Sequence, residues 1–270
     1  VRKANRVGAG IHCACIGSNA QRKTRTNAAN AGLMSWSSWT WRGLLASTRQ
    51  RSFTKSRLSS LREGESAHMK IVHVETLIAE GKYASSREWK KNRKDLHEAI
   101  QAVDWPRGSG TFTIYPESGK RRGEGNGVTP IKLGLLKRLV GEGWKLEQPL
   151  DITTSARTGG LDAILETKHG ILALEWETGN ISSSHRALNK MALGLLKGKL
   201  VGAVLVVPSR NLYIYLTDRI GNYSELMPYL HLWKSLPITE GVLEIVVIEH
   251  DATSPDVPRI PKGTDGRALG

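Results

Sequence analysis

The pattern of apolar and polar positions changes character at residue 69. Residues 1–68 show no sustained amphipathic period and contain stretches rich in Ser, Arg and Asn. From Met69 onward, apolar residues recur at the spacings typical of helices and strands. We therefore expect one globular domain over residues 69–270. The preceding segment, residues 1–68, is expected to carry none of the chemistry and to be either disordered or not part of the native protein.

The pattern after Met69 predicts helices interleaved with strands. Helices are expected at residues 70–80, 86–103, 130–141, 182–196, 209–217 and 222–235. Strands are expected at 111–115, 161–166, 171–177, 201–207 and 242–248. The run 201–207 is apolar throughout, as is typical of a strand buried on both faces. This order predicts a single α/β domain with a central mixed sheet flanked by helices.

The positive charge of the chain is concentrated in its first quarter. The net charge is +14; residues 1–68 hold 12 of the 39 Lys and Arg and 2 of the 25 Asp and Glu, which leaves 27 and 23 for the rest, or +10 and +4. Charge alone is therefore weak support for nucleic-acid binding by residues 69–270. Three interpretations of the N-terminal segment stay open: a gene start placed before a true start at Met69, a disordered basic arm that contacts phosphates, or an organelle-type presequence.

Composition excludes several classes of protein. No run approaches the roughly 18 consecutive apolar residues of a membrane span, and no signal peptide is recognisable. The two cysteines, Cys13 and Cys15, lie one residue apart, which argues against a disulfide framework and a structural zinc site. We therefore expect a soluble cytoplasmic protein without a membrane partner.

Three acidic residues lie on two strands that are predicted to pair. The runs 161–166 and 171–177 are joined through Lys168-His169-Gly170. If the turn is centred between residues 168 and 169, antiparallel partners satisfy i + j = 337, and Asp162 lies across from Glu175. Because side chains alternate between faces, Glu177 shares the face of Glu175. Three carboxylates are thus expected to converge at one end of an apolar hairpin.

Such a cluster needs a neutralising cation or bound protons. Oxygen ligands suit Mg²⁺ or Mn²⁺ better than Zn²⁺ or Cu²⁺, and Glu147 could supply a further oxygen. Magnesium held by carboxylates is the usual apparatus for phosphodiester cleavage. Two other interpretations stay open: the acids form the solvated face of a strand, or paired carboxylates hydrolyse a glycoside. The segment lacks the dense aromatic lining that a sugar site favours.

The stretch 175–186, Glu-Trp-Glu-Thr-Gly-Asn-Ile-Ser-Ser-Ser-His-Arg, closely resembles type II restriction endonucleases of the BamHI family. The resemblance continues in register from about residue 69 to the end. It includes Trp105-Pro106, Asn126-Gly127-Val128, Asn189-Lys190, Pro228-Tyr229 and Asp265-Gly266. It implies the PD-(D/E)xK nuclease fold and Mg²⁺-dependent cleavage of double-stranded DNA by a homodimer.

The resemblance also implies roles for the acidic residues. Asp162 matches the metal-bridging carboxylate, Glu175 a metal ligand, and Glu147 a ligand of a second metal. The main-chain carbonyl of Trp176 would complete a metal shell. Two Mg²⁺ ions per active site are implied, with Mn²⁺ as a substitute. Glu177 stands where the wider superfamily usually carries Lys, and it matches the general base of this branch.

DNA contacts are implied at a further set of positions. Base-reading residues are matched by Asn180, Ser182, Arg186, Asp218 and Arg219. Lys132 matches a residue near the scissile phosphate, and Asp265-Gly266 an arm that reaches the minor groove. Arg pairs with guanine and Asp accepts from the cytosine amino group. The implied target is GGATCC, cut after the first G, and a cognate DNA methyltransferase is the implied functional partner.

The dimer contacts depart from the family pattern. The resemblance places the interface on helices near 184–197 and 222–235, where the residues that differ in charge from the family are Leu196, Lys197, His231, Trp233 and Lys234. Its ion pairs are therefore not carried over, although a palindromic site still requires two-fold symmetry. Two alternative functions stay open: a related metal-dependent nuclease with another specificity, and a catalytically inactive DNA-binding relative.

Overall fold

The computed structural model describes residues 69–121, 123–149, 159–177, 179–217 and 220–262. The strands are β1 (Lys70–Glu80), β2 (Thr113–Ile114), β3 (Lys145–Pro149), β4 (Gly160–Thr167), β5 (Gly170–Trp176), β6 (Gly202–Pro208), β7 (Gly241–Glu249) and β8 (Ala252–Thr253). The helices are α1 (Gly81–Ser85), α2 (Arg87–Gln101), α3 (Thr129–Gly141), α4 (Ile181–Leu196), α5 (Arg210–Tyr213), α6 (Tyr223–Leu226), the 3₁₀ helix η1 (Met227–Tyr229) and α7 (Leu230–Lys234).

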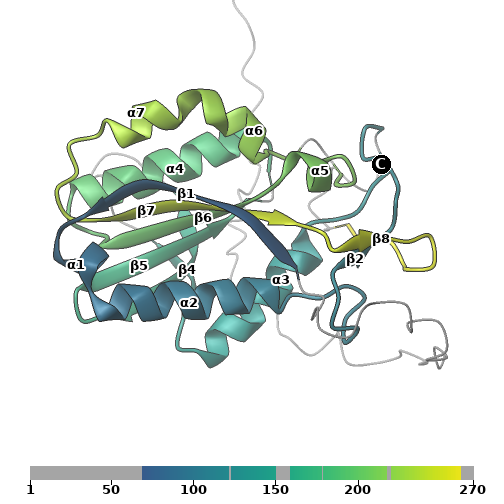
Figure 1. Cartoon of the computed structure of the whole chain (residues 1–270), viewed down its shortest axis with the longest axis horizontal. Helices are drawn as coiled ribbons and strands as arrows, with labels where there is room; N and C mark the ends of the chain where they lie inside the picture. Colours follow the sequence, from purple (N-terminus) through teal and green to yellow (C-terminus); the bar gives the residue numbers. More distant parts are fainter. Residues whose placement is uncertain (1–68, 122, 150–158, 178, 218–219, 263–270) are drawn as a thin grey trace, which may run out of the picture. The chain divides into compact units, whose positions relative to one another are not determined.

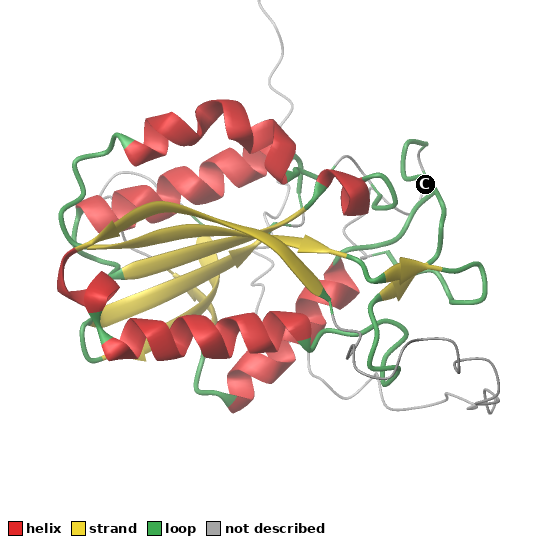
Figure 2. Cartoon of the chain, viewed as in Figure 1, coloured by secondary structure: helices red, strands yellow, loops and turns green. Residues whose placement is uncertain are grey.

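Six of these strands form one mixed sheet in the order β1-β7-β6-β5-β4-β3. β5, β6 and β7 run parallel, whereas β1, β4 and β3 join the sheet through antiparallel pairs. Helices α4, α6 and α7 cover one face, and α2 and α3 cover the other (Figure 1). Figure 2 shows the same sandwich of helices around the strands, so the predicted mixed sheet flanked by helices is confirmed. Within the described residues, no helix has the length and apolarity needed to cross a membrane.

Each face of the sheet carries its own apolar layer. On β6, Val204 and Val206 belong to the layer under α2 and α3, whereas Leu205 and Val207 belong to the layer under α4. This division follows from the alternation of side chains along a strand. Every residue of β6 and β7 is buried. This confirms the prediction that the run 201–207 is a strand covered on both faces, and the strand predicted at 242–248 is buried in the same way.

Residues 70–80, predicted as a helix, form the edge strand β1, so that prediction was wrong. β1 pairs antiparallel with β7 from Lys70 opposite Glu249 to Glu80 opposite Gly241. The buried strand β7 has main-chain donors and acceptors on that side, and burial makes their pairing obligatory. β-Branched residues in the segment, such as Ile71 and Val72, also favour a strand. Long-range pairing therefore decides the structure here.

Other elements agree with the pattern or are shorter than predicted. Helices α2, α3 and α4 lie at predicted positions. Only Arg210–Tyr213 of the predicted helix 209–217 is helical, and the predicted helix 222–235 is divided into α6, η1 and α7. Pro228 lies in η1, and a residue without a backbone N–H interrupts a helical hydrogen-bond ladder. β3 had not been predicted.

The β4–β5 hairpin has the predicted register. Its partners run from Ala163 opposite Leu174 to Thr167 opposite Gly170, and each pair adds to 337. Asp162 and Glu175 continue this register by one position. The sheet thus brings the two carboxylates to the same end of neighbouring strands.

Candidate active site

Two carboxylates on adjacent strands form the centre of the site. Asp162 lies near the start of β4 and Glu175 near the end of β5. The Trp176 N–H donates to Asp162 Oδ2 over 2.8 Å. The main chain of β5 therefore orients the carboxylate of β4. Both acidic side chains line a cavity of about 490 Å³.

Each of these carboxylates has a lysine partner. Lys132, on α3, donates from Nζ to Asp162 Oδ1. Lys190, on α4, forms an ion pair through Nζ with Glu175 Oε1 and donates to the carbonyl oxygen of Gly160 over 2.6 Å. Because α3 and α4 cover opposite faces of the sheet (Figure 1), each face supplies one cation to the site.

The electrostatics of the site favour an added cation. Burial and the nearby Asp162 carboxylate raise the pKa of Glu175, against the opposing effect of Lys190. A cation close to both carboxylates would stabilise their ionised forms, and their oxygens are ligands that Mg²⁺ and Mn²⁺ accept. Among the described residues, no three His, Cys, Asp or Glu side chains are grouped closely enough to hold a metal ion. Hard cations such as Mg²⁺ keep several water ligands and are commonly held by only one or two carboxylates.

Glu177 follows β5 directly and lines the same cavity. Its N–H donates to the Val206 carbonyl over 3.0 Å, which extends the pairing of β5 with β6 by one residue. Its Oε1 accepts the N–H of Gly179. Only 6% of Glu177 is exposed. The Val206 contact fixes the backbone of Glu177, and the Gly179 N–H fixes its carboxylate. A third carboxylate is thus held in the cavity wall.

One face of α4 completes the cavity. The lining residues from this helix are Ser183, Arg186, Ala187 and Lys190, which follow helical spacing. Arg186 is exposed and donates to Ser183 Oγ over 3.5 Å. Asn180 caps α4 by accepting the Ser183 N–H over 3.3 Å, and Ser182 is exposed beside it. Exposed polar side chains, the predicted base readers Asn180, Ser182 and Arg186 among them, therefore lie at the start of α4.

Glu147 stands at the register position opposite Asp162, because its neighbours Leu146 and Gln148 pair with Ala163 and Leu161. It is exposed on β3 and is not among the residues that line the cavity. Its φ is 51°, and it is the one residue other than glycine with a positive φ in the described part of the chain. A left-handed conformation costs a non-glycine residue on the order of 1 kcal/mol or more and is often retained near functional sites. The unusual backbone conformation of Glu147 is therefore consistent with a functional role at this position.

Four predicted DNA contacts lie outside the described residues: Asp218, Arg219, Asp265 and Gly266. Ile220 and Gly221, which follow Asp218 and Arg219 in the sequence, lie at the start of α4. Ile220 forms an antiparallel bridge with Asn180, and the Gly221 N–H donates to the Gly179 carbonyl over 2.8 Å. Residue 220 is therefore adjacent to the predicted base-reading segment.

Lys190 is a site residue to which the sequence analysis gave no role. A usable signal was present, because Lys190 lies four residues after Arg186 and seven after Ser183, on the same helical face. A lysine followed by Met191-Ala192 on an otherwise apolar stretch of α4 is also unusual. Its pairing with Glu175 required the packing of α4 on the sheet.

The chain matches the family model described as restriction endonuclease BamHI over residues 69–267. It is 45% identical over 201 residues to the type II restriction enzyme OkrAI of Oceanobacter kriegii, which covers 74% of this chain and 100% of that one. It is 38% identical over 180 residues to the type II restriction enzyme BamHI of Bacillus amyloliquefaciens, which covers 64% and 80%. Among solved structures, restriction endonuclease BglII complexed with a DNA 16-mer aligns with a TM-score of 0.46 and 10% identity, over 70% of this chain and 87% of that one.

Proposed function

Because this chain belongs to the BamHI family of restriction endonucleases, we propose that it cleaves double-stranded DNA at the palindrome GGATCC, after the first G, with Mg²⁺ as cofactor. The family and enzyme class predicted from the sequence are confirmed by these matches. We assign the catalytic and DNA-binding domain to residues 69–270. The remaining parts of the proposal rest on the geometry of the site.

One observation carries the proposal. Asp162, Glu175 and Glu177 line a single cavity together with Lys132, at the ends of β4 and β5. The same cavity is bordered by exposed polar side chains at the start of α4. A phosphodiester placed there would meet carboxylates for a metal, a proton acceptor and a cation within one site. Carboxylate-bound metal ions, a proton acceptor and a nearby cation together are suited to hydrolysis of a phosphodiester.

The residues would divide the chemistry as follows. Asp162, Glu175 and the Trp176 carbonyl would hold Mg²⁺, and Glu147 would contribute to a second ion. Bound Mg²⁺ supplies Lewis acidity for the attacking water and the leaving oxygen. Glu177 accepts the proton of the attacking water, since its carboxylate is fixed in the cavity wall by main-chain contacts.

Lys132 has a separate role in this proposal. Its ammonium lies against Asp162 in the cavity and can donate to an oxygen of the scissile phosphate. A cation at this place stabilises the negative charge that develops on the phosphate.

Base reading is assigned to the start of α4 and to the segment that contains Asp218 and Arg219. Arg186 is exposed beside the cavity, and arginine pairs bidentately with guanine in the major groove. Asn180 and Ser182 present further donors and acceptors on the same helix end, and Asp265-Gly266 would reach the minor groove. GGATCC follows from the match of these residue types to the family pattern.

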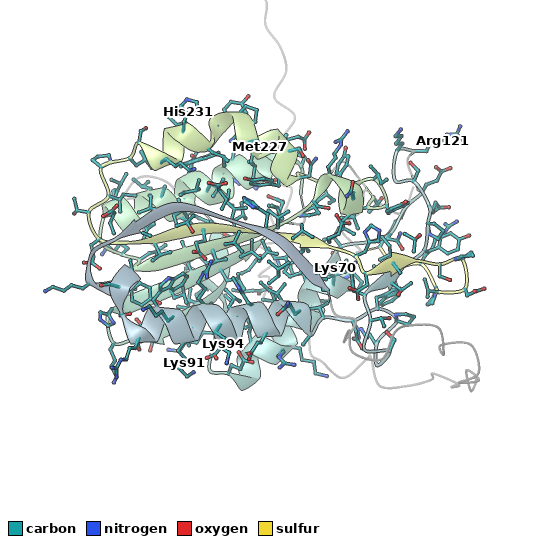
Figure 3. The ribbon with its side chains drawn as sticks, in the orientation of Figure 1. Lys70, Lys91, Lys94, Arg121, Met227 and His231 are labelled. Atoms are coloured by element: carbon teal, nitrogen blue, oxygen red, sulfur yellow. The ribbon has the colours of Figure 1, made fainter. Side chains whose placement is uncertain are left out.

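A homodimer is proposed on the face formed by α4, η1 and α7. Four large apolar side chains are exposed there: Leu196 (43%), Met227 (54%), Tyr229 (50%) and Leu232 (55%). Figure 3 shows Met227 and His231 on the helices that lie beside α4 over the same face of the sheet. Exposed apolar residues gathered on one face are typical of a protein interface. A palindromic target is matched by a two-fold symmetric dimer.

Digestion of mapped DNA tests the proposal. The full chain and the 69–270 polypeptide should both cut at GGATCC with Mg²⁺ and leave DNA intact without it. Mapping cuts at other sequences would favour a nuclease of different specificity, and binding without cutting would favour an inactive relative. We place the enzyme in the cytoplasm with the DNA of its own cell, so DNA methylated within GGATCC by a cognate methyltransferase should resist cleavage.

A further inference from the structure

Lys190 is a buried cation with two partners in the active site. Only 9% of the residue is exposed. Its Nζ forms an ion pair with Glu175 Oε1 and donates to the carbonyl of Gly160 over 2.6 Å. Gly160 begins β4, two residues before Asp162, and Glu175 lies near the end of β5. One ammonium group therefore links the two strands that carry the central carboxylates.

A lysine at this place is not explained by packing. Neighbouring positions on α4, Leu188, Met191 and Ala192, belong to the apolar layer under the helix. An apolar side chain of similar length would fill the same space without the desolvation cost of a buried ammonium. Both polar contacts of Lys190 lie in the active site, so its charge serves that site.

We infer that Lys190 is a positioning residue, an inference that rests on the proposed metal site. Lys190 holds Glu175 in place before a divalent cation binds, and it competes with that cation for the Glu175 carboxylate. Two cations close to one carboxylate repel each other. Loss of the ammonium should therefore make divalent-cation binding tighter. The loss also removes the link between Glu175 and Gly160, so the carboxylate should be oriented less well for catalysis.

The test compares Lys190→Met with the wild-type full chain. Mg²⁺ is titrated into DNA-free protein by calorimetry, and single-turnover cleavage of a GGATCC duplex is measured over a range of Mg²⁺ concentrations. We expect half-saturation at an Mg²⁺ concentration lower by on the order of five-fold or more. At saturating Mg²⁺ the cleavage rate should fall by about 10–100-fold. DNA affinity should not change.

Two further variants separate this role from general effects. Lys199→Met removes the same charge from an exposed position after α4 and should leave both readouts at wild-type values. Lys190→Gln is a second neutral variant that can still donate to the Gly160 carbonyl, and it should show the same tighter binding if Lys190→Met does not fold. The double variant Lys190→Met/Glu175→Gln should lose the gain in Mg²⁺ affinity.

Several results would overturn the inference. Unchanged or weaker Mg²⁺ binding by folded Lys190→Met or Lys190→Gln would show that Lys190 has a packing role or supports the metal. Tighter binding that persists in the double variant would show that Glu175 is not the contested ligand. If wild-type protein shows no Mg²⁺ response in either assay, the proposed cofactor itself fails and the inference fails with it.

Discussion

The backbone N–H of Trp176 donates to Asp162 Oδ2 across the β4–β5 hairpin, over 2.8 Å. The regular pairing of β4 with β5 begins one position further along, at Ala163 opposite Leu174. The Asp162 side chain, rather than a backbone carbonyl, therefore accepts the Trp176 N–H. The second oxygen of the carboxylate meets Lys132. A local hairpin therefore sets the orientation of a carboxylate that we propose as a metal ligand.

Asp162→Asn should abolish cleavage while the protein remains folded. The asparagine carbonyl can still accept the Trp176 N–H, but the negative charge that would hold the metal is lost. We expect the single-turnover rate to fall by on the order of 10³-fold or more, with little change in the thermal unfolding temperature. Glu166→Gln is the control, because Glu166 is exposed on the same strand and pairs with Lys145. Cleavage near the wild-type rate in Asp162→Asn would remove the metal from this hairpin.

Glu177→Gln should slow cleavage without weakening DNA binding. Glutamine retains an oxygen that can accept the Gly179 N–H but cannot take a proton from water. Loss of a general base costs on the order of 10²–10⁴-fold. Glu177→Lys should not rescue the rate, since lysine is protonated at neutral pH and would add a cation near Glu175. A Gln variant that cuts within a few-fold of wild type would assign Glu177 a structural role.

Arg186→Ala should weaken binding to GGATCC more than binding to random DNA. A bidentate contact between arginine and guanine contributes about 1–3 kcal/mol of discrimination. Fluorescence anisotropy at several salt concentrations measures both affinities. Lys91→Ala on α2, on the opposite side of the sheet (Figure 3), is the control for lost charge. Equal losses on both DNAs would identify Arg186 as a phosphate contact.

Leu232→Glu should weaken the dimer. Leu232 is 55% exposed on the face that also holds Met227 and Tyr229, and a charge buried in an interface is costly. We expect the dimer dissociation constant to rise by about ten-fold or more, as measured by analytical ultracentrifugation. Leu133→Glu on α3 changes a leucine of similar exposure, 49%, on the opposite face and should leave the dimer intact. Equal effects of the two variants would place the interface elsewhere.

Glu75 should stabilise the fold in a pH-dependent way. Burial acts in the opposite direction, but hydrogen bonds from Lys234, Tyr223 and His73 outweigh it and lower the pKa of Glu75 from 4.5 to about 2. A carboxylate whose folded pKa is lower than its unfolded pKa contributes stability that is fully present above pH 4.5 and is lost as the pH falls toward 2.

Urea unfolding of wild type and Glu75→Gln measures this contribution. Wild type should be more stable at pH 7, and the difference should shrink between pH 4.5 and 2. Glu98→Gln, at an exposed carboxylate on α2, should show no such change. A difference between wild type and Glu75→Gln that is independent of pH would mean that charge on Glu75 is not its source.

The sequence by itself determined the parts of this protein that depend on short-range order. β6 and β7 are recognisable from their runs of apolar residues. In α2, α3 and α4 the apolar residues recur at helical spacing. The turn at Lys168-His169-Gly170 is local, so the register that places Asp162 opposite Glu175 could be predicted from residues a few positions apart. Family membership was also readable, because the motif from Glu175 to Arg186 is contiguous.

The tertiary structure decided the features that depend on residues far apart in the chain. β1 is a strand because the buried edge of β7 needs main-chain partners, which outweighs the local pattern that had suggested a helix. Lys190 reaches Gly160, 30 residues away, only because α4 packs against the sheet. Local periodicity shows which face of an element is apolar, but which side chains meet across elements depends on the packing of the whole domain.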